Sequence, residues 1–388
     1  MTTRTHCPAV AVPAVEPCDP GELSPLVDWL ARGEPATETL AFPRGTVLAD
    51  GRLDLCKQAL GPDGAQRVLA ALRGHPGIRS ILLGTGAIGN QGAAAVAEAL
   101  DGGARLDTVY LGCNRIDEAG VAVLGDAVAR RGVDALWLKR NPLGVAGARR
   151  IAALVAGGAG PRVLDLFNCE LDDPGVAIVA EALASPGSRV EHVYLGGNAA
   201  GAPAAAALGA MLAVTPRLRS LQLSASRLGD DGAAALAAGL ARNGSLDELG
   251  LACNAIGARG AAALAGALAG HPRLVELDLG SVTSARALGE PSNQLGDAGA
   301  LALAPLLAAD PPLRVLDLHD NMIRSHGGMA LWRALAGNHQ LRELRLGRFV
   351  ARSIKRRLRE LLAGRGPALP GMPHHVAMIQ SVYRSPRR

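Results

Sequence analysis

The sequence predicts an α/β solenoid with a parallel inner sheet and outer helices, in which about ten repeats of 28 residues each supply one strand and one helix. The prediction depends on a marker residue, most often Asn, that recurs at nearly constant spacing, on a glycine six residues after most markers, and on alternating leucines before them. Successive markers are 27 to 29 residues apart, except for one interval of 39 that contains an insertion. The markers are Gln58, Gly86, Asn114, Asn141, Cys169, Asn198, Ser226, Asn254, Asn293 and Asn321.

A short strand is predicted before each marker, because leucines there alternate with other residues. The clearest repeat runs from Leu106 to Gly120 and reads LDTVYLGCNRIDEAG. Alternate side chains of a strand point to opposite faces, so the aliphatic residues of this segment turn to one side. The marker side chain is expected to bond backbone groups of the turn that follows, and Cys or Ser can take the place of Asn.

A helix is predicted after each strand, as in the segment GDDGAAALAAGLA that follows Leu228. Its apolar residues gather on one side. One strand and one helix cannot bury these faces alone, but stacked copies form a parallel inner sheet covered by a layer of helices. Because helices are wider than strands, we expect the stack to curve with the sheet on its concave side.

These repeats resemble leucine-rich repeats of the ribonuclease-inhibitor type, from about Gly51 to Leu346. The resemblance implies a horseshoe-shaped solenoid over residues 51–347. It also implies a role in holding other proteins, because the family includes a ribonuclease inhibitor, GTPase-activating proteins and sensor domains of innate-immunity receptors. It identifies no particular partner, since one fold carries many functions.

The segments outside the repeats are predicted to be caps and tails. Residues 1–20 are Pro-rich and predicted to be disordered, and residues 21–50 are predicted to cap the first repeat. Residues 348–364 predict a capping helix with a basic outer face, and residues 365–388 predict a basic, mobile tail. The apolar stripe of the capping helix consists of Val350, Ile354, Leu358 and Leu361.

An insertion is predicted between the strand and the helix of the eighth repeat, at residues 281–292. Its Ser, Thr, Gly, Glu and Pro content is typical of a loop. We expect this loop to project from the rim of the solenoid, where long loops often touch ligands. A projecting loop without a ligand is an equal alternative.

The concave face is predicted to carry the binding residues. The residue between the two leucines of each strand and the residue after the second leucine should point there. Four of the nine aromatic residues fall at these positions in consecutive repeats, with charged residues among them, which is the usual composition of a binding hot spot. Acidic residues occupy the later repeats. The predicted partner-binding residues are Tyr110, Trp137, Lys139, Arg140, Asp165, Phe167, His192, Tyr194, Glu248, Asp278 and Asp317.

A structural alternative exists for the aromatic residues. A curved sheet can pack aromatic side chains against one another without any ligand. A register shifted by one residue would bury all four of them. The alternating leucines argue against this shift, because they would then face water.

The charge is unevenly distributed along the chain. The chain has 40 Lys plus Arg and 35 Asp plus Glu, a net charge of +5. The segment from Leu341 onward alone holds 12 basic and 2 acidic residues, so the remainder is net negative. Nucleic-acid binding is therefore a prediction for the tail only.

The predicted function is a protein-binding scaffold that holds a partner macromolecule on its concave face, as an inhibitor or a sensor does. The acidic half would suit a basic partner, and ribonucleases are often basic. One alternative is a GTPase-activating regulator that uses a rim residue such as Arg115, Arg140 or Asn141. Another is contact with nucleic acid or an anionic surface through the basic C-terminal segment.

Neither catalysis nor a cofactor is predicted. The sequence lacks the GxxxxGK[ST], HExxH and GxSxG motifs. The six cysteines show no CxxC pair and no zinc spacing, so no metal is expected, and their repeat positions favour a reducing, cytoplasmic location. Neither a secretory signal nor a membrane span is predicted, and the oligomeric state is left open.

Overall fold

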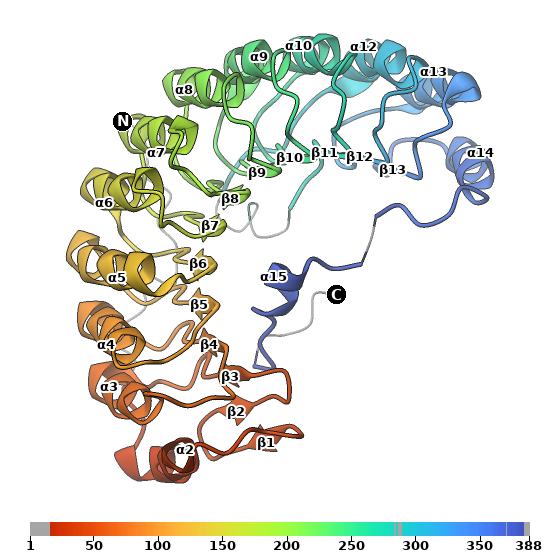
Figure 1. The fold of residues 1–388 in the computed structure, drawn as a ribbon. Coiled ribbons are helices and arrows are strands. Elements are labelled where there is room, and N and C mark those ends of the chain that lie inside the picture. The colour runs from red at the N-terminus through yellow and green to blue at the C-terminus, as the bar shows by residue number, and fades with distance from the viewer. Residues whose placement is uncertain (1–15, 283–284, 286–288, 370, 384–388) are drawn as a thin grey trace. The chain divides into compact units, whose positions relative to one another are not determined.

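The structure, a computed structural model, describes residues 16–282, 285, 289–369 and 371–383 (Figure 1). The chain forms two compact units. In the described part, the N-terminal unit comprises 16–171, 185–190 and 372–383, and the C-terminal unit comprises 172–184 and the stretch from 191 to 371. Most of the segment predicted to be disordered, residues 1–15, lies outside the described residues.

The N-terminal unit is a sheet covered by helices on one side. Strands β3 to β7 are parallel and pair in chain order, and the hairpin β1–β2 adds to β3 in antiparallel orientation. The strands are β1 (Leu40–Ala41), β2 (Thr46–Val47), β3 (Arg52–Asp54), β4 (Ser80–Leu82), β5 (Thr108–Tyr110), β6 (Ala135–Trp137) and β7 (Val163–Asp165). The helices are α2 (Pro20–Arg32), α3 (Gly61–Ala71), α4 (Gly89–Asp101), α5 (Glu118–Arg131), α6 (Gly144–Ala156) and α15 (His374–Ala377).

The C-terminal unit repeats this plan, and its strands β8 to β13 pair in parallel and in chain order. The strands are β8 (His192–Tyr194), β9 (Ser220–Gln222), β10 (Glu248–Gly250), β11 (Glu276–Asp278), β12 (Val315–Leu318) and β13 (Glu343–Leu346). The helices are α7 (Asp173–Ala184), α8 (Ala202–Leu212), α9 (Gly229–Leu240), α10 (Ala258–Leu268), α12 (Gly296–Ala308), α13 (Ser325–Ala334) and α14 (Arg352–Leu362), with a short 3-10 turn, η1 (Leu335–Gly337).

The marker Asn forms a hydrogen-bonded ladder between repeats. The Oδ1 of Asn141 accepts from the N–H groups of Asn114 (2.9 Å) and Ile116 (3.1 Å) in the preceding repeat. Its Nδ2 donates to the carbonyls of Leu111 (3.0 Å) and Leu138 (2.7 Å). The side chain therefore satisfies buried backbone groups of two repeats, not only those of its own turn as the sequence predicted.

A second set of hydrogen bonds joins the start of several helices, among them α10 and α13, to the repeat before them. The Oδ1 of Asp230 accepts from the N–H groups of Gly257 (2.7 Å) and Gly260 (2.8 Å), where α10 begins. The Oδ1 of Asp297 does the same for Gly327 (2.9 Å) at the start of α13. A carboxylate is stabilised there because the first N–H groups of a helix have no partner within the helix.

These hydrogen bonds explain the periodic glycine in two of the repeats. A Cβ on Gly260 would lie 2.8 Å from the Oδ1 of Asp230, and one on Gly327 would lie 2.7 Å from the Oδ1 of Asp297. Any larger residue would push the capping carboxylate away from the helix. At these two positions glycine therefore permits the close approach of the preceding repeat.

Segments at both ends pack onto the open repeats. In the N-terminal unit, the ring of Trp29 on α2 lies 6.0 Å from that of Phe42 and 5.0 Å from that of His75. In the C-terminal unit, α14 lies within the segment 348–364 and packs against α13. Of its predicted stripe, Val350, Ile354 and Leu358 are buried, whereas Leu361 is 37% exposed.

The prediction of a projecting insertion is wrong for its described residues. Ala285 is buried in a small apolar cluster with Ala225 and Cys253 from the two preceding repeats. The buried carboxylate of Glu290 bonds the guanidinium of Arg227 at 2.7 Å. Ala285 and Glu290 therefore pack onto their own unit, and this ion pair compensates for burying the carboxylate.

The chain shows no helix, within the described ranges, that is long and apolar enough to span a membrane.

Candidate binding surfaces on the inner strand face

We define the inner face of each unit as the face of its strands that points away from its helices. The first and third residues of each strand reach this face, whereas the middle residues, such as Leu53 and Leu136, are buried against the helices. Strand pairing aligns Leu82, Tyr110 and Trp137 with one another, so these side chains share one face of the sheet.

The inner face of the N-terminal unit carries buried side chains although the layer α2–α6 covers the opposite side of the sheet. Tyr110 is 2% exposed and Trp137 is 3% exposed. The ammonium group of Lys139 lies 5.6 Å from the centre of the Tyr110 ring, a distance that allows a cation–π contact. Of the other predicted residues, Asp165 is buried, and Arg140 and Phe167 are half-buried.

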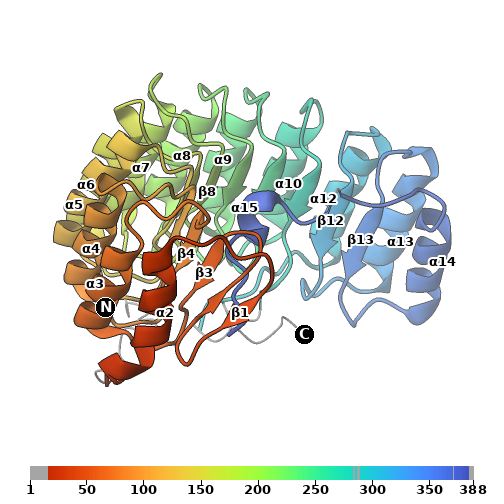
Figure 2. The same cartoon turned by 60° about the horizontal axis from the view of Figure 1, so that its bottom comes forward.

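The C-terminal segment of the chain lies on this inner face. The views in Figures 1 and 2 both place α15 on the strand side of the N-terminal unit, opposite its helices. The imidazole of His375 stacks on the indole of Trp137, with 6.2 Å between ring centres. The tail that the sequence predicted to be mobile is instead packed against the first repeats over residues 372–383.

Polar contacts fix the backbone of this segment. One guanidinium nitrogen of Arg52 donates to the carbonyls of Ala377 (3.1 Å) and Gln380 (2.7 Å). The fully buried carboxylate of Asp54 accepts from the N–H of Val382 (2.7 Å) and from the hydroxyl of Ser381 (3.1 Å). Both groups mainly recognise main-chain atoms, so the contact depends only weakly on the sequence that is held.

Two further contacts extend the docking along neighbouring strands. The hydroxyl of Ser80 donates to the carbonyl of Met378 at 3.2 Å, and the hydroxyls of Thr46 and Tyr383 lie 2.6 Å apart. Met378 and Ile379 are each 8% exposed, so the segment contributes one apolar pair to the interface.

Sequence reasoning missed these docking residues. Arg52 and Ser80 precede the first aliphatic residue of their strands, a position that the predicted set of inner residues did not include systematically. The alternation of the strand could have found them, because every second residue shares a face. Asp54 was assigned to the inner face, but nothing in its repeat indicated a ligand.

The inner face of the C-terminal unit carries acidic residues in register. Glu248 pairs with Glu276, and Asp278 pairs with Asp317 on the next strand. Glu248, Glu276 and Asp278 are half-buried, whereas Asp317 is 4% exposed. Of the other residues predicted on this unit, His192 and Tyr194 are half-buried on β8.

Crowding of carboxylates on this face perturbs their protonation. Burial, together with the nearby carboxylates of Glu248 and Asp278, raises the pKa of Glu276 to about 7. Burial also raises the pKa of Asp278, although the N–H of Gly280 stabilises its charged form. The central part of this surface therefore holds more negative charge than it can solvate well.

The last two strands partly neutralise the acidic row. Asp317 accepts from the imidazole of His319 at 2.5 Å and pairs with the guanidinium of Arg345 at 3.2 Å. Arg345 also bonds Glu343 at 2.7 Å. The uncompensated charge is therefore concentrated on β10 and β11.

The residues proposed for a rim role differ in exposure. Asn141 is 1% exposed, and its amide is used by the ladder between repeats, so its side chain is not presented at the rim. Arg115 is exposed and Arg140 is half-buried. Both adopt a left-handed backbone conformation, with φ of 59° and 58°.

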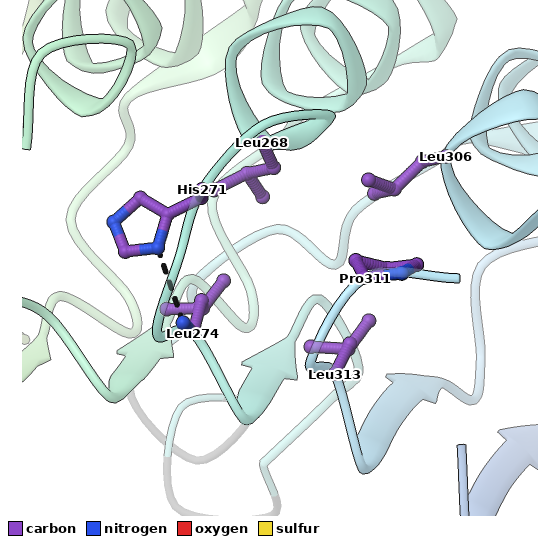
Figure 3. Close-up of a pocket in the computed structure, with 6 residues that line it drawn as sticks. All are labelled: Leu268, His271, Leu274, Leu306, Pro311 and Leu313. Carbon is purple, nitrogen blue, oxygen red and sulfur yellow. Dashed lines mark hydrogen bonds between the residues drawn. The ribbon is translucent and has the colours of Figure 1, made fainter. Parts of the chain in front are cut away.

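A small pocket in the C-terminal unit lies between helix ends and is lined by apolar side chains (Figure 3). Its single imidazole, His271, accepts from the N–H of Leu274 at 3.1 Å and shapes the turn before β11. The pocket therefore has the character of a packing gap between repeats. Its lining residues are Leu268, His271, Leu274, Leu306, Pro311 and Leu313.

Comparison with known proteins identifies the class of the fold. A family model described as Leucine Rich repeat matches residues 216–237 and 242–265. A chain in the crystal structure of the yeast Rad7 and Elc1 complex superposes with a TM-score of 0.52 and 16% identity, covering 89% of this chain and 81% of its own. The leucine-rich-repeat protein LegL7 from Legionella pneumophila gives a TM-score of 0.49 and 18% identity, covering 76% of this chain and 94% of its own. None of the curated proteins matches this chain in sequence.

The regular succession of strand, marker Asn and helix defines an α/β solenoid of stacked repeats. Together with the family match and the fold of the yeast structure, it shows that the chain has a leucine-rich-repeat fold.

Proposed function

We propose that this protein is a scaffold that holds a segment of a partner protein on its inner strand face. The observation that carries the proposal is the docking of residues 372–383 on β3 to β6. This face accommodates a polypeptide in a defined conformation: Arg52 donates a hydrogen bond to it, Asp54 accepts one from it, and Trp137 makes an aromatic contact. A surface that binds one segment through main-chain atoms has the chemistry to bind another.

The acidic row of the C-terminal unit favours a basic partner. Glu276 is held next to Glu248, and the pKa of Glu276 is raised by burial and by that neighbour. A Lys or Arg side chain placed between these carboxylates would relieve the repulsion and would speed the encounter at low salt. A role as an inhibitor of a basic enzyme is one form of this proposal, and a sensor is another.

The two alternatives have weaker support. A GTPase-activating role would depend on Arg115, because the Asn141 side chain is used by the ladder between repeats. Contact with nucleic acid or an anionic surface would use α14, where Arg352, Arg356 and Arg359 are exposed. Our proposal includes no catalytic step.

Site-specific photocrosslinking in a native lysate tests the proposal. A photoreactive residue replaces Tyr194, which is half-buried on the inner face, or Val123, which is 49% exposed on the helix layer. We expect a discrete crosslinked partner only from position 194. Equal labelling from both positions, or labelling from position 123 alone, would show that the inner face is not the binding surface.

Once the partner is purified, Tyr194→Ala and Glu248→Gln should each weaken its binding by about tenfold or more, as truncation of an interface anchor usually does. The exposed Glu181 on α7 provides a matched control, because Glu181→Gln changes the same charge outside the strands. Affinity that also falls steeply with added salt would support a basic partner.

A further inference from the structure

We propose that residues 372–383 are a built-in competitor that occupies the binding surface of the N-terminal unit until a partner segment of the same chemistry displaces it. This inference rests on the proposed function, because it assumes that the inner face binds proteins. It adds a mode of regulation and the kind of peptide that the surface accepts.

The surface that holds the segment has the composition of a binding site. Leu82, Tyr110 and Trp137 lie in register on three adjacent strands, with Arg52 and Lys139 nearby. The imidazole of His375 covers part of the Trp137 ring, so removal of residues 372–383 would expose apolar surface on the inner face. Apolar patches rimmed by charge mark interaction surfaces in monomeric proteins.

The segment meets this surface as a peptide ligand does. One helical turn, His374–Ala377, leads into the apolar pair Met378 and Ile379, and a turn follows. The carbonyls at the end of the helical turn face Arg52, and an N–H and a hydroxyl from the turn bind Asp54. Side-chain anchors and main-chain bonds thus divide the recognition.

The small size of the contact makes it reversible. Only Met378 and Ile379 of the segment are buried, whereas Met372 and Val382 are 56% and 53% exposed. A helix of one turn has little stability of its own. Its covalent connection assists these contacts, because a short flexible linker provides a local concentration of about 1 mM.

The fitting partner follows from these contacts. It is an exposed segment of another protein with two consecutive apolar side chains, an aromatic or imidazole group four residues before the second one, and a polar turn after them. Its main chain replaces that of residues 377–382 at Arg52 and Asp54. A basic flank would also suit the partner favoured by the acidic row, but this inference does not require it.

The competition has a calculable effect. If the isolated segment binds with a Kd of about 10 μM, a local concentration of about 1 mM keeps the surface roughly 99% occupied. An added ligand then binds with an apparent Kd about 100-fold above its intrinsic value, because only the open fraction is competent. Cutting the connection and removing the segment should abolish this factor.

The experiment uses the full chain with a protease recognition sequence inserted between Gly366 and Pro367. The uncut protein and the cut protein, freed of its C-terminal piece by gel filtration, are titrated with a fluorescent synthetic peptide of residues 367–388. We expect the cut protein to bind the peptide at least about 30-fold more tightly than the uncut protein. Arg52→Ala in the cut protein should weaken the binding, and so should Ile379→Asp in the peptide. Met372→Asp in the peptide is the matched control and should have little effect, because Met372 is exposed.

Each other outcome overturns the inference. Equal binding to cut and uncut protein would mean that the segment does not compete, although the inner face would still bind peptides. A cut protein that retains its circular dichroism but binds no peptide would show that these contacts do not hold the segment. Unfolding of the cut protein, or failure of the piece to separate, would make the segment a fixed part of the fold. An uncut dimer that dissociates on cutting would assign the surface to the segment of a second copy.

The crosslinking at position 194 tests the proposed function in the other unit, so the two proposals can fail separately.

Discussion

The inner faces of the two units are formed by the same strand positions, but the side chains at these positions differ in polarity and in exposure. In the N-terminal unit, Tyr110 and Trp137 are the third residues of β5 and β6. They are 2% and 3% exposed, on a face that holds residues 372–383. In the C-terminal unit Asp278 occupies the same position of its strand and is half-buried. The repeat determines which side chains reach the inner face. In the N-terminal unit these side chains are apolar and buried on a face that holds a docked segment, whereas in the C-terminal unit they are charged and partly exposed.

One strand position shows the difference for a single residue type. Asp54 and Asp278 both accept the N–H two residues ahead, from Cys56 at 3.0 Å and from Gly280 at 2.7 Å. Asp54 receives two further hydrogen bonds from the docked segment. The pKa of Asp278 is raised by burial and by the neighbouring carboxylate of Asp317. A docked chain thus satisfies the carboxylate in one unit, and the other unit has acceptors that suit a cationic ligand.

The largest loss of stability is expected from removing the marker Asn of the hydrogen-bonded ladder. Comparing this loss in the two units tests whether they differ only at their inner faces. Asn141→Ala removes the acceptor of two buried N–H groups in the N-terminal unit, and Asn254→Ala removes the equivalent acceptor in the C-terminal unit. Each buried group left without a partner costs about 1–3 kcal/mol, so each variant should lose roughly 3 kcal/mol of unfolding free energy. Denaturant titration followed by circular dichroism measures the loss.

The exposed Gln91 on α4 serves as the control, because Gln91→Ala should change stability by less than about 0.5 kcal/mol. Similar losses for Asn141→Ala and Asn254→Ala would place the difference between the units on their inner faces. A loss confined to one variant would mean that the two scaffolds are themselves unequal.

The second prediction concerns the uncovered acidic face. Burial raises the pKa of Glu276 to about 7, from an ordinary value of 4.5. The folded state therefore keeps a proton that the unfolded state releases, and this contribution to stability is lost as the pH rises through about 7. Glu276→Gln removes the charge, so at pH 8 the variant should be more stable than wild type by about 1–2 kcal/mol, after a discount for partial exposure.

Thermal unfolding at pH 4 and pH 8 checks the sign. The advantage of Glu276→Gln should appear only at pH 8, and Glu181→Gln should show no such difference. A gain that is the same at both pH values would mean that the carboxylate is not protonated in the folded state, and the face would then lack the strain that favours a cationic partner.

The repeat architecture could be predicted from the sequence because local periodicity carries it. The marker spacing, the alternating leucines and the glycine six residues later each reflect contacts that recur in several repeats, such as the Asn141 ladder or the approach of Gly260 to Asp230. The order and the register of the strands followed from the same pattern.

The occupied surface could not be predicted in the same way. The bond between Asp54 and Val382 joins residues 328 positions apart, and the segment around Met378 has no repeat signature. Only the apolar pair Met378 and Ile379 in an otherwise basic tail hinted at a contact. The insertion was misjudged for a similar reason, since its composition is that of a loop and gives no sign that Ala285 would pack on Cys253.

The smallest expected effect concerns the turns behind the inner faces, where the two units should behave alike. Burial lowers the pKa of His75 in the N-terminal unit and of His271 in the C-terminal unit. Because the unfolded imidazole titrates near 6.5 and the folded one only below this value, the contribution to stability is present above pH 6.5 and is lost as the pH falls. Asn338 holds the same turn position and its Oδ1 accepts from Leu341 at 2.9 Å, as His271 accepts from Leu274, so His271→Asn keeps the turn and removes the titration.

We expect wild type to lose up to about 1 kcal/mol relative to His271→Asn between pH 7.5 and pH 5.5, with His75→Asn giving the same sign. His326, which is exposed, provides the control, and His326→Asn should leave the pH dependence unchanged. The histidine contribution to stability is lost as the pH falls, whereas the Glu276 contribution is lost as the pH rises. The two titrations can therefore be separated in one curve of stability against pH. If the stability changes caused by His75→Asn and His271→Asn differed in sign, the two units would differ in their pH response at these turns. The contrast between the two inner faces would then no longer account for that difference.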